Sequence, residues 1–277
     1  VRHVSAWHEG RQTMSETSVL ERPVDLRSDK PAVDIPEHIV EVISDSGEGA
    51  QRCGQSLAAI AARSGNGIWT VEIIPAEIQP PARSVAGASG IRIRIGSKRV
   101  TNGGDQTDLV VAFNEQVLLG RVKAGELKKG ATIILESMWR EHADPAIAAS
   151  YANTVTALRE GGFHLIEAPL ERECRKLVAD ARKGKNMFVL GMLCSIYSLD
   201  LGLARAQIAL IFGKKDEKVI ASNVKLMEAG FAWAEQQLDF KYRIPAAKIT
   251  EPQVVVSGNT AIALGVLASG MDICAMY

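Results

Sequence analysis

The residues best suited to chemistry form a glycine-rich run, Gly47-Glu48-Gly49-Ala50-Gln51, between an apolar strand and an alanine-rich helix. The strand is expected at His38–Ile43, and the helix continues to Ser64. The free N–H groups of such a loop and the positive end of the following helix point to the same place, which favours an anion. The run therefore predicts either an anion-binding loop or a tight strand-to-helix turn, and the sequence leaves both open.

The spacing in this run departs from the familiar phosphate-binding fingerprints. A dinucleotide fingerprint needs a third glycine three residues after Gly49, where the chain has Arg52. A P-loop needs Gly-Lys-Ser/Thr, which the run lacks.

Three arginines and the histidines are weaker candidates for a binding or catalytic site. Arg83 is the only charge in a loop of small residues, where its guanidinium could hold a phosphate or carboxylate or form a surface pair with an acid. Arg92 and Arg94 alternate with isoleucines, which predicts a strand with one solvated face. The five histidines are scattered without ligand spacing, so we expect neither a catalytic residue nor a metal site.

The amino-acid composition argues against several classes of binding partner and of metal site. Lys plus Arg and Asp plus Glu both total 32, so the net charge is zero and general attraction to nucleic acid or acidic membranes is not expected. The longest apolar run, Met187–Tyr197, is too short to span a bilayer. Since no two cysteines form a C-x-x-C pair, we expect buried, reduced thiols in a cytoplasmic protein, without a zinc or iron–sulfur site. The cysteines are Cys53, Cys174, Cys194 and Cys274.

Strands and helices alternate through the first half of the chain, which predicts a parallel sheet with crossover connections. The expected strands are His38–Ile43, Ile68–Ile74, Gly90–Ile95, Asp108–Phe113, Ala131–Glu136 and Phe163–Glu167. Helices dominate afterwards, and Asn186–Tyr197 is apolar on every side, as in a buried helix. The fold class is therefore α/β: an open, Rossmann-like, mostly parallel sheet with a helical C-terminal portion.

Composition shifts divide the chain into four parts. Residues 1–36 are charged and aperiodic, as in a flexible arm, and residues 37–238 form the main domain. Residues 239–252 are charged and contain two prolines, as in a linker. Residues 253–277 read as a strand, a turn, a small-residue helix and the beginning of another strand. Because that last strand lacks partners, we expect a truncated second α/β domain and a natural polypeptide that continues.

This C-terminal segment carries a family resemblance. SGNTAIALGVLASGMDICAMY, residues 257–277, resembles the start of the alpha domain of 2-oxoacid:ferredoxin oxidoreductases. There a Gly-Asn-x-Ala-x-Ala-x-Gly helix leads to a strand that ends in Tyr before Pro-Ile-Thr-Pro. The preceding part is similar to the gamma domain of these enzymes, in DLVVAFNEQVLLGRVKAGELKKGATIILES (residues 108–137) and KNMFVLGMLCSIYSLDL (residues 185–201).

The order of the two domains is similar to the large subunit of the 2-oxoglutarate type, and the run PARSVAGASG at residues 81–90 favours that subtype. The gamma domain opens with Gly-x-Gly-Gly-Gln-Gly, from which Ala50 and Arg52 depart. The resemblance implies oxidative decarboxylation of a 2-oxoacid to an acyl-CoA, with electrons passed to ferredoxin. It implies thiamine diphosphate, magnesium and [4Fe-4S] clusters only in the complete complex, with a beta subunit carrying the diphosphate and clusters. The expected assembly is a dimer of heterodimers, and this chain alone is expected to be inert.

For this chain the resemblance implies coenzyme A near the gamma domain. The candidate binding residues are Gly47, Glu48, Gly49, Ala50, Gln51, Arg83, Ser84 and Asn259. Asn259 starts the last helix, where it is either an active-site neighbour or, as we favour, a helix cap. Two other readings remain open: a free-standing, Rossmann-like nucleotide-binding protein and a non-catalytic assembly module.

Overall fold

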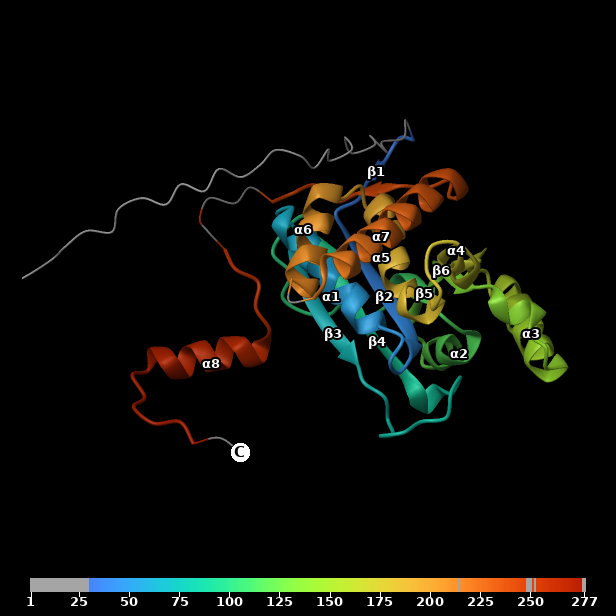
Figure 1. The fold of residues 1–277 in the computed structure, drawn as a ribbon, viewed down its shortest axis with the longest axis horizontal. Helices are drawn as coiled ribbons and strands as arrows, with labels where there is room; N and C mark the ends of the chain where they lie inside the picture. The colour runs from blue at the N-terminus through green and yellow to red at the C-terminus, as the bar shows by residue number, and fades with distance from the viewer. Residues whose placement is uncertain (1–29, 214, 248–250, 252, 276–277) are drawn as a thin grey trace, which may run out of the picture.

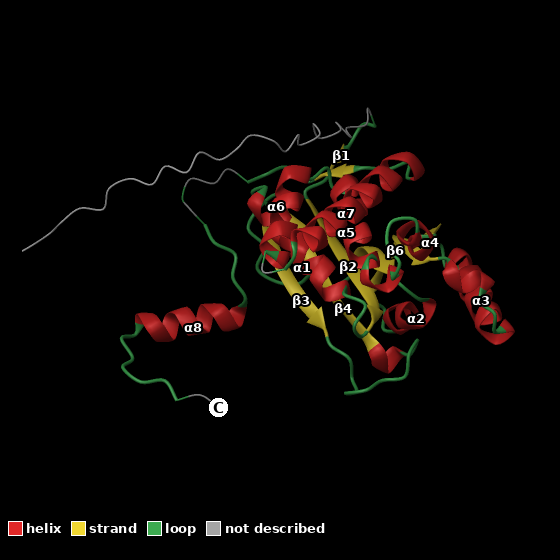
Figure 2. Ribbon diagram, viewed as in Figure 1, coloured by secondary structure: helices red, strands yellow, loops and turns green. Residues whose placement is uncertain are grey.

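A six-stranded sheet forms the centre of the protein in a computed structural model that describes residues 30–213, 215–247, 251 and 253–275 (Figures 1 and 2). The strand order is β3-β4-β2-β5-β6-β7. Neighbours β2, β5, β6 and β7 are parallel, whereas β4 runs antiparallel to both β2 and β3. The strands are β2 (Glu37–Asp45), β3 (Gly67–Ile73), β4 (Ala88–Gly96), β5 (Thr107–Ala112), β6 (Leu127–Glu136) and β7 (His164–Ala168). The predicted α/β class with a mostly parallel sheet is confirmed.

Helices cover both faces of the sheet (Figure 2). One core lies between the sheet and the helices α1 (Ala50–Arg63), α4 (Leu170–Arg175), α5 (Lys185–Ile196), α6 (Leu201–Phe212) and α7 (Glu217–Gln237). The other core lies under α2 (Glu115–Lys123) and α3 (Pro145–Glu160). Side chains alternate along β2, so Val40 and Val42 enter the first core and Ile43 enters the second.

The apolar helix α5 is buried, as its sequence predicts. It packs closely on α7 through two glycines, Gly191 and Gly230. A Cβ on Gly191 would lie 1.8 Å from the carbonyl oxygen of Met227, and one on Gly230 would lie 1.9 Å from that of Phe188. Only glycine allows the two backbones to approach this closely.

A buried ion network corrects the prediction that Arg92 faces solvent. Arg92 is 8% exposed, and its guanidinium donates to the fully buried Glu41 on β2 at 2.8 Å. Arg121 of α2 donates to the same carboxylate at 2.7 Å. The alternation of arginine and isoleucine wrongly predicts a solvated face, because α2 covers this face of the sheet and supplies the second cation. Arg94 lies nearer the surface and pairs with Glu37 at 2.7 Å.

Residues 30–36 and the predicted linker meet in a two-stranded sheet. β1 (Val33–Asp34) pairs in parallel with β8 (Tyr242–Arg243). Arg243 donates to both carboxylate oxygens of Asp34, at 2.6 and 2.8 Å. The described part of the predicted arm is therefore ordered, because a partner 209 residues away completes it. Residues 1–29 of that arm lie outside the described residues.

The C-terminal segment differs from its prediction. α8 (Gly258–Ala268) forms, but neither flanking segment is a strand within residues 253–275. α8 buries none of its residues and lies apart from the sheet in Figure 1. Cys274 is exposed, in contrast to the predicted burial that Cys53, Cys174 and Cys194 confirm. Among the described residues, no helix combines the length and apolar character needed to cross a membrane.

Candidate functional site

Two neighbouring cavities open at the carboxyl edge of the parallel strands. The larger is about 690 Å³ and the smaller about 440 Å³, and both are bordered by Glu48, Trp139, His142 and Arg182. Asp45 ends β2, Gln116 lies in the first turn of α2 after β5, and Trp139 lies on η2 (Met138–Glu141) after β6. Because β4 runs the other way, the loop before it brings Arg83 to the same edge. Ligands of open α/β sheets bind at this edge.

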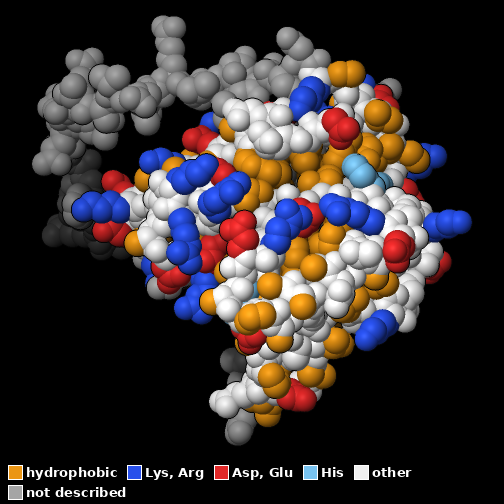
Figure 3. All heavy atoms as spheres, turned by 90° about the vertical axis from the view of Figure 1, so that its right-hand side faces the viewer, with side chains coloured by type: hydrophobic (Ala, Val, Ile, Leu, Met, Phe, Trp, Pro, Cys, Tyr) orange, Lys and Arg blue, Asp and Glu red, His pale blue; other side chains and the backbone are white. Residues whose placement is uncertain are grey.

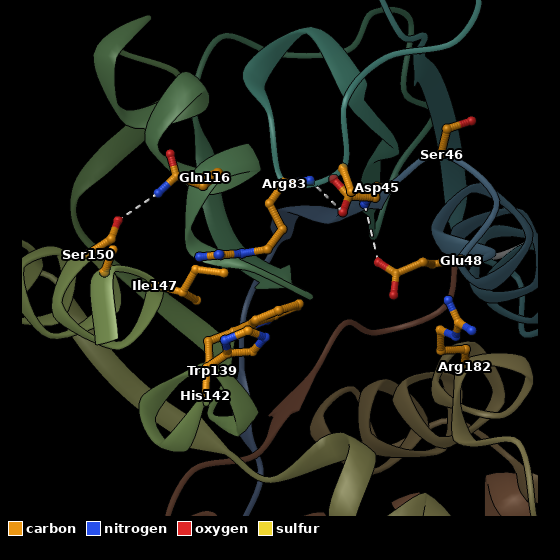
Figure 4. Close-up of a pocket in the computed structure, with 12 residues that line it drawn as sticks. Asp45, Ser46, Glu48, Arg83, Gln116, Trp139, His142, Ile147, Ser150 and Arg182 are labelled. Atoms are coloured by element: carbon orange, nitrogen blue, oxygen red, sulfur yellow. Dashed lines mark hydrogen bonds between the residues drawn. The ribbon is translucent and has the colours of Figure 1, made fainter. Parts of the chain in front are cut away.

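The glycine-rich loop is a tight turn whose acidic side chain folds back on it. Gly47 and Gly49 adopt φ values of +88° and +85°, which other residues rarely adopt. A carboxylate oxygen of Glu48 accepts from the backbone N–H of Asp45 at 3.3 Å, and the other accepts from Lys185 at 2.9 Å (Figure 4 shows the first bond). A carboxylate of the protein itself thus already binds a loop N–H and the neighbouring cation Lys185.

The rest of the predicted loop serves the fold. Ala50 is the buried first residue of α1, and the Gln51 side chain donates to the carbonyl oxygen of Ile73 at 3.3 Å. Gly49 caps α1, and a Cβ there would lie 2.6 Å from the amide nitrogen of Asn186. Of the five loop residues, only Glu48 lines the cavities.

Lys185 lies at the floor of the smaller cavity with 1% of its side chain exposed. Besides Glu48, its ammonium lies 3.9 Å from a carboxylate oxygen of Glu171 and 5.1 Å from the ring centre of Phe113. Behind them, burial raises the pKa of Glu136 to about 7, against the opposing effect of Lys185 and of N–H donors from Met138 and Glu171. Three acidic side chains therefore surround one buried cation.

Arg83 forms a wall of the larger cavity, but its charge is already paired. Its guanidinium donates to Glu115, whose side chain is fully buried, and lies 4.4 Å from the ring centre of Trp139. Its backbone has a φ of +52°, and its N–H donates to Asp45 at 2.9 Å (Figure 4). Of the two predicted roles, ion pairing is the one observed, although the pair is buried and not on the surface.

Unsatisfied polar atoms collect at the same edge of the sheet. Asp45 Oδ1, Arg83 Nε, Asn114 Nδ2 and Glu115 Oε2 are buried and lack a hydrogen-bond partner within the described part of the chain. Buried polar atoms are rarely left unpaired, and such atoms call for a water or ligand nearby. The edge therefore retains hydrogen-bonding capacity that the protein itself does not use.

Ser84 and Asn259 do not contribute to this site. Ser84 caps η1 (Val85–Gly87), accepting from the N–H of Gly87 at 3.0 Å. Asn259 lies on the exposed α8, and the cap of that helix is Ser257, so the favoured capping role of Asn259 is wrong. In the described residues, no group of three or more His, Cys, Asp or Glu side chains could hold a metal ion.

Several residues in or beside the cavities are not singled out by the sequence: Trp139, His142, Arg182 and Lys185 in the linings, and Glu115 as the partner of Arg83. One usable signal is position, because Glu115 and Trp139 lie within three residues after buried parallel strands. Another is the lysine at the start of the otherwise apolar α5, where the positive helix end disfavours a cation. A lysine in that place needs acidic partners, which the fold supplies.

Charges of both signs cover the face that Figure 3 shows, with hydrophobic atoms exposed between them. This mixture agrees with the zero net charge of the chain. On this face, recognition of an anion would therefore depend on individual side chains and not on a broad basic surface.

Comparison with known proteins gives consistent matches. The family described as pyruvate ferredoxin/flavodoxin oxidoreductase matches residues 41–233. The 2-oxoglutarate oxidoreductase subunit KorA of Mycobacterium tuberculosis is 29% identical over 84% of this chain. The chain spans only 37% of that relative's length.

Solved structures share the fold. A 2-oxoglutarate:ferredoxin oxidoreductase from Magnetococcus marinus, with 2-oxoglutarate, coenzyme A and succinyl-CoA bound, superposes with a TM-score of 0.69 at 23% identity. The match covers 86% of this chain and 38% of that one. The pyruvate oxidoreductase subunit PORC of Thermotoga maritima matches 71% of this chain and 96% of its own, with a TM-score of 0.50 and 16% identity.

Proposed function

Because the chain belongs to the pyruvate ferredoxin/flavodoxin oxidoreductase family, we propose that it forms the coenzyme A-facing part of a 2-oxoacid:ferredoxin oxidoreductase of the 2-oxoglutarate type. The proposed overall reaction converts a 2-oxoacid and coenzyme A to an acyl-CoA and carbon dioxide, with reduction of ferredoxin. The observation that carries this proposal is the pair of cavities at the carboxyl edge of the sheet. The proposed 2-oxoglutarate type rests on the printed names of the relatives.

The larger cavity suits part of a long, amphipathic ligand. Its volume of about 690 Å³ lies within the usual range for small-molecule sites. Trp139 and Ile147 offer an apolar wall, and Gln116 and Ser150 are joined by a 2.9 Å hydrogen bond (Figure 4). Such a wall can pack against the pantetheine arm while the amide and hydroxyl groups meet its peptide-like bonds. In this proposal the chain binds and orients coenzyme A and excludes water from it.

The redox chemistry belongs to groups held elsewhere in the proposed complex. Thiamine diphosphate with magnesium would supply the carbanion chemistry, and iron–sulfur clusters would carry the electrons. Cys53, Cys174 and Cys194 are buried and Cys274 is exposed, an arrangement that supports placing the clusters on a partner. We therefore propose a beta subunit as carrier of these groups, ferredoxin as acceptor and a dimer of heterodimers as the assembly. The exposed apolar residues of α8, including Ile262 and Leu267, support association with further protein.

Calorimetric titration of coenzyme A into the folded chain tests the proposal. We expect micromolar affinity, about −8 kcal/mol. Ala146→Trp should block the cavity that Ala146 lines and weaken binding at least tenfold. Ala149→Trp is the matched control, because Ala149 is an exposed residue of the same helix outside the cavity lining. Equal affinity of wild type and Ala146→Trp, or no binding by folded wild type, would contradict the coenzyme A assignment.

Three further measurements separate the alternatives. Turnover of 2-oxoglutarate by the isolated chain with coenzyme A and a dye acceptor should be absent, and activity would contradict the assignment of the redox groups to a partner. Saturable binding of NAD or FAD would instead favour a free-standing nucleotide-binding protein. Copurification with a beta subunit without affinity for coenzyme A would favour an assembly module.

A further inference from the structure

Four cations of the described residues line the two cavities, and three of them already have an acidic partner. Arg83 pairs with Glu115, Arg175 with Glu171, and Lys185 with Glu48 at 2.9 Å. In each pair the acid is at most 17% exposed, so its charge is fixed beside the cation. At Arg83 and Lys185, whose side chains are 12% and 1% exposed, an incoming anion would have to compete with these carboxylates at low dielectric, where the competition is strongest. Arg175 is 69% exposed, so its pair with Glu171 lies nearer solvent.

Arg182 is the fourth cation, and no carboxylate of the described chain forms an ion pair or hydrogen bond with it. It lies on η3 (Ala181–Lys183), is exposed, and borders both cavities. Figure 4 shows it on the same side of the larger cavity as Glu48, across from Gln116, Ile147 and Ser150. Its guanidinium retains a full set of donors for a phosphate or carboxylate.

The acidic side chain of the glycine loop disfavours binding of an anion at that loop. Glu48 borders both cavities and is held by the Asp45 N–H and by Lys185. A second anion would have to displace this carboxylate before it could bind the loop N–H or Lys185. A ligand anion that enters is therefore directed toward Arg182.

We propose that Arg182, and neither the glycine-rich loop nor Arg83, anchors the anionic group of the ligand that fills these cavities. This inference rests on the proposed function and specifies it. The anionic group has two possible sources with the same chemistry: a phosphate of coenzyme A or a carboxylate of the 2-oxoacid. Arg182 is then a specificity-determining residue that selects ligands by charge, and Glu48 excludes anions from the neighbouring loop.

Calorimetric titrations of three probes test the anchor: coenzyme A, pantetheine without phosphates, and 2-oxoglutarate. Each is titrated into wild type, Arg182→Gln and Arg172→Gln. Arg172 is the matched control, because it is 77% exposed, carries the same charge and lines neither cavity. Both substitutions lie on the surface, so both variants should fold, and circular dichroism verifies that they do.

We expect Arg182→Gln to weaken the binding of coenzyme A at least tenfold and to leave the affinity for pantetheine unchanged. Arg172→Gln should change neither affinity. A loss of affinity confined to 2-oxoglutarate would also support the anchor and would identify the anchored group as a carboxylate of the 2-oxoacid. If wild type binds coenzyme A and Arg182→Gln binds every probe equally well, the anchor is refuted while the proposed function stands. If folded wild type binds neither coenzyme A nor 2-oxoglutarate, the proposed function and the anchor both fail.

Discussion

Replacing Lys185 by methionine should destabilise the protein through the acids that its ammonium holds. The side chain is 1% exposed, and its partner carboxylate on Glu48 is 17% exposed. Removing one partner of a buried ion pair costs about 3–5 kcal/mol. The expected loss lies at the lower end of this range, about 3 kcal/mol, because Glu48 remains partly solvated and still accepts a hydrogen bond from the Asp45 N–H. Methionine fills nearly the same volume, so the loss reports charge and not a cavity.

The reciprocal substitution, Glu48→Gln, should be more damaging, about 4 kcal/mol, because it leaves the deeper group charged. Lys185 would then retain Glu171, at 3.9 Å, and the nearby Glu136, which burial keeps largely protonated below pH 7. The double variant Lys185→Met/Glu48→Gln should recover about 2 kcal/mol relative to the sum of the single losses. This recovery is the coupling energy of the pair.

Urea denaturation followed by far-ultraviolet circular dichroism measures these free energies, and thermal melting provides a second reading. A loss of 3 kcal/mol corresponds to a melting temperature lowered by about 6–12 °C for a domain of this size. The reasoning is refuted if Lys185→Met lies within about 1 kcal/mol of wild type, or if the single losses simply add in the double variant.

The remaining predictions concern pH, the loop and helix packing. The pKa of Glu136 is about 7 in the folded protein and 4.5 in the unfolded chain. The folded state therefore binds the proton more tightly, and this group makes stability fall as pH rises between those values, by about 3 kcal/mol. Glu136→Gln should flatten that fall in urea titrations at several pH values, and an unchanged slope would contradict the assignment. Gly49→Val should lose at least about 2 kcal/mol of stability, because its Cβ would meet Asn186 and the backbone has a positive φ. Gly47→Ala has equal backbone strain but nothing within 4 Å of its Cβ, so it should lose only about 1 kcal/mol. Gly191→Ala should cost more than about 3 kcal/mol by forcing α5 from α7, and near wild-type melting would rule out the packing described above.

Local patterns in the sequence are sufficient for most elements of the fold. Alternation of apolar strands with helices predicts the parallel sheet, and the all-apolar run around Met187 predicts a buried helix. Gly47 and Gly49 predict the turn into α1 because the required backbone conformation is a property of those residues themselves. The predictions fail for the segments beside α8, where apolar residues alone do not supply the neighbouring strands that a strand needs.

Charge partners, in contrast, are decided by the tertiary structure. Lys185 and Glu48 are separated by 137 residues, and Arg83 and Glu115 by 32, yet strand order brings each pair to one edge of the sheet. An arginine or lysine in the sequence carries no signal of whether an acid will neutralise it, because Coulomb attraction depends on distance and burial and not on separation along the chain. The sequence therefore determines the elements and the loop, whereas only the folded arrangement pairs Arg83 with Glu115 and leaves Arg182 at the cavities without an ion pair among the described residues.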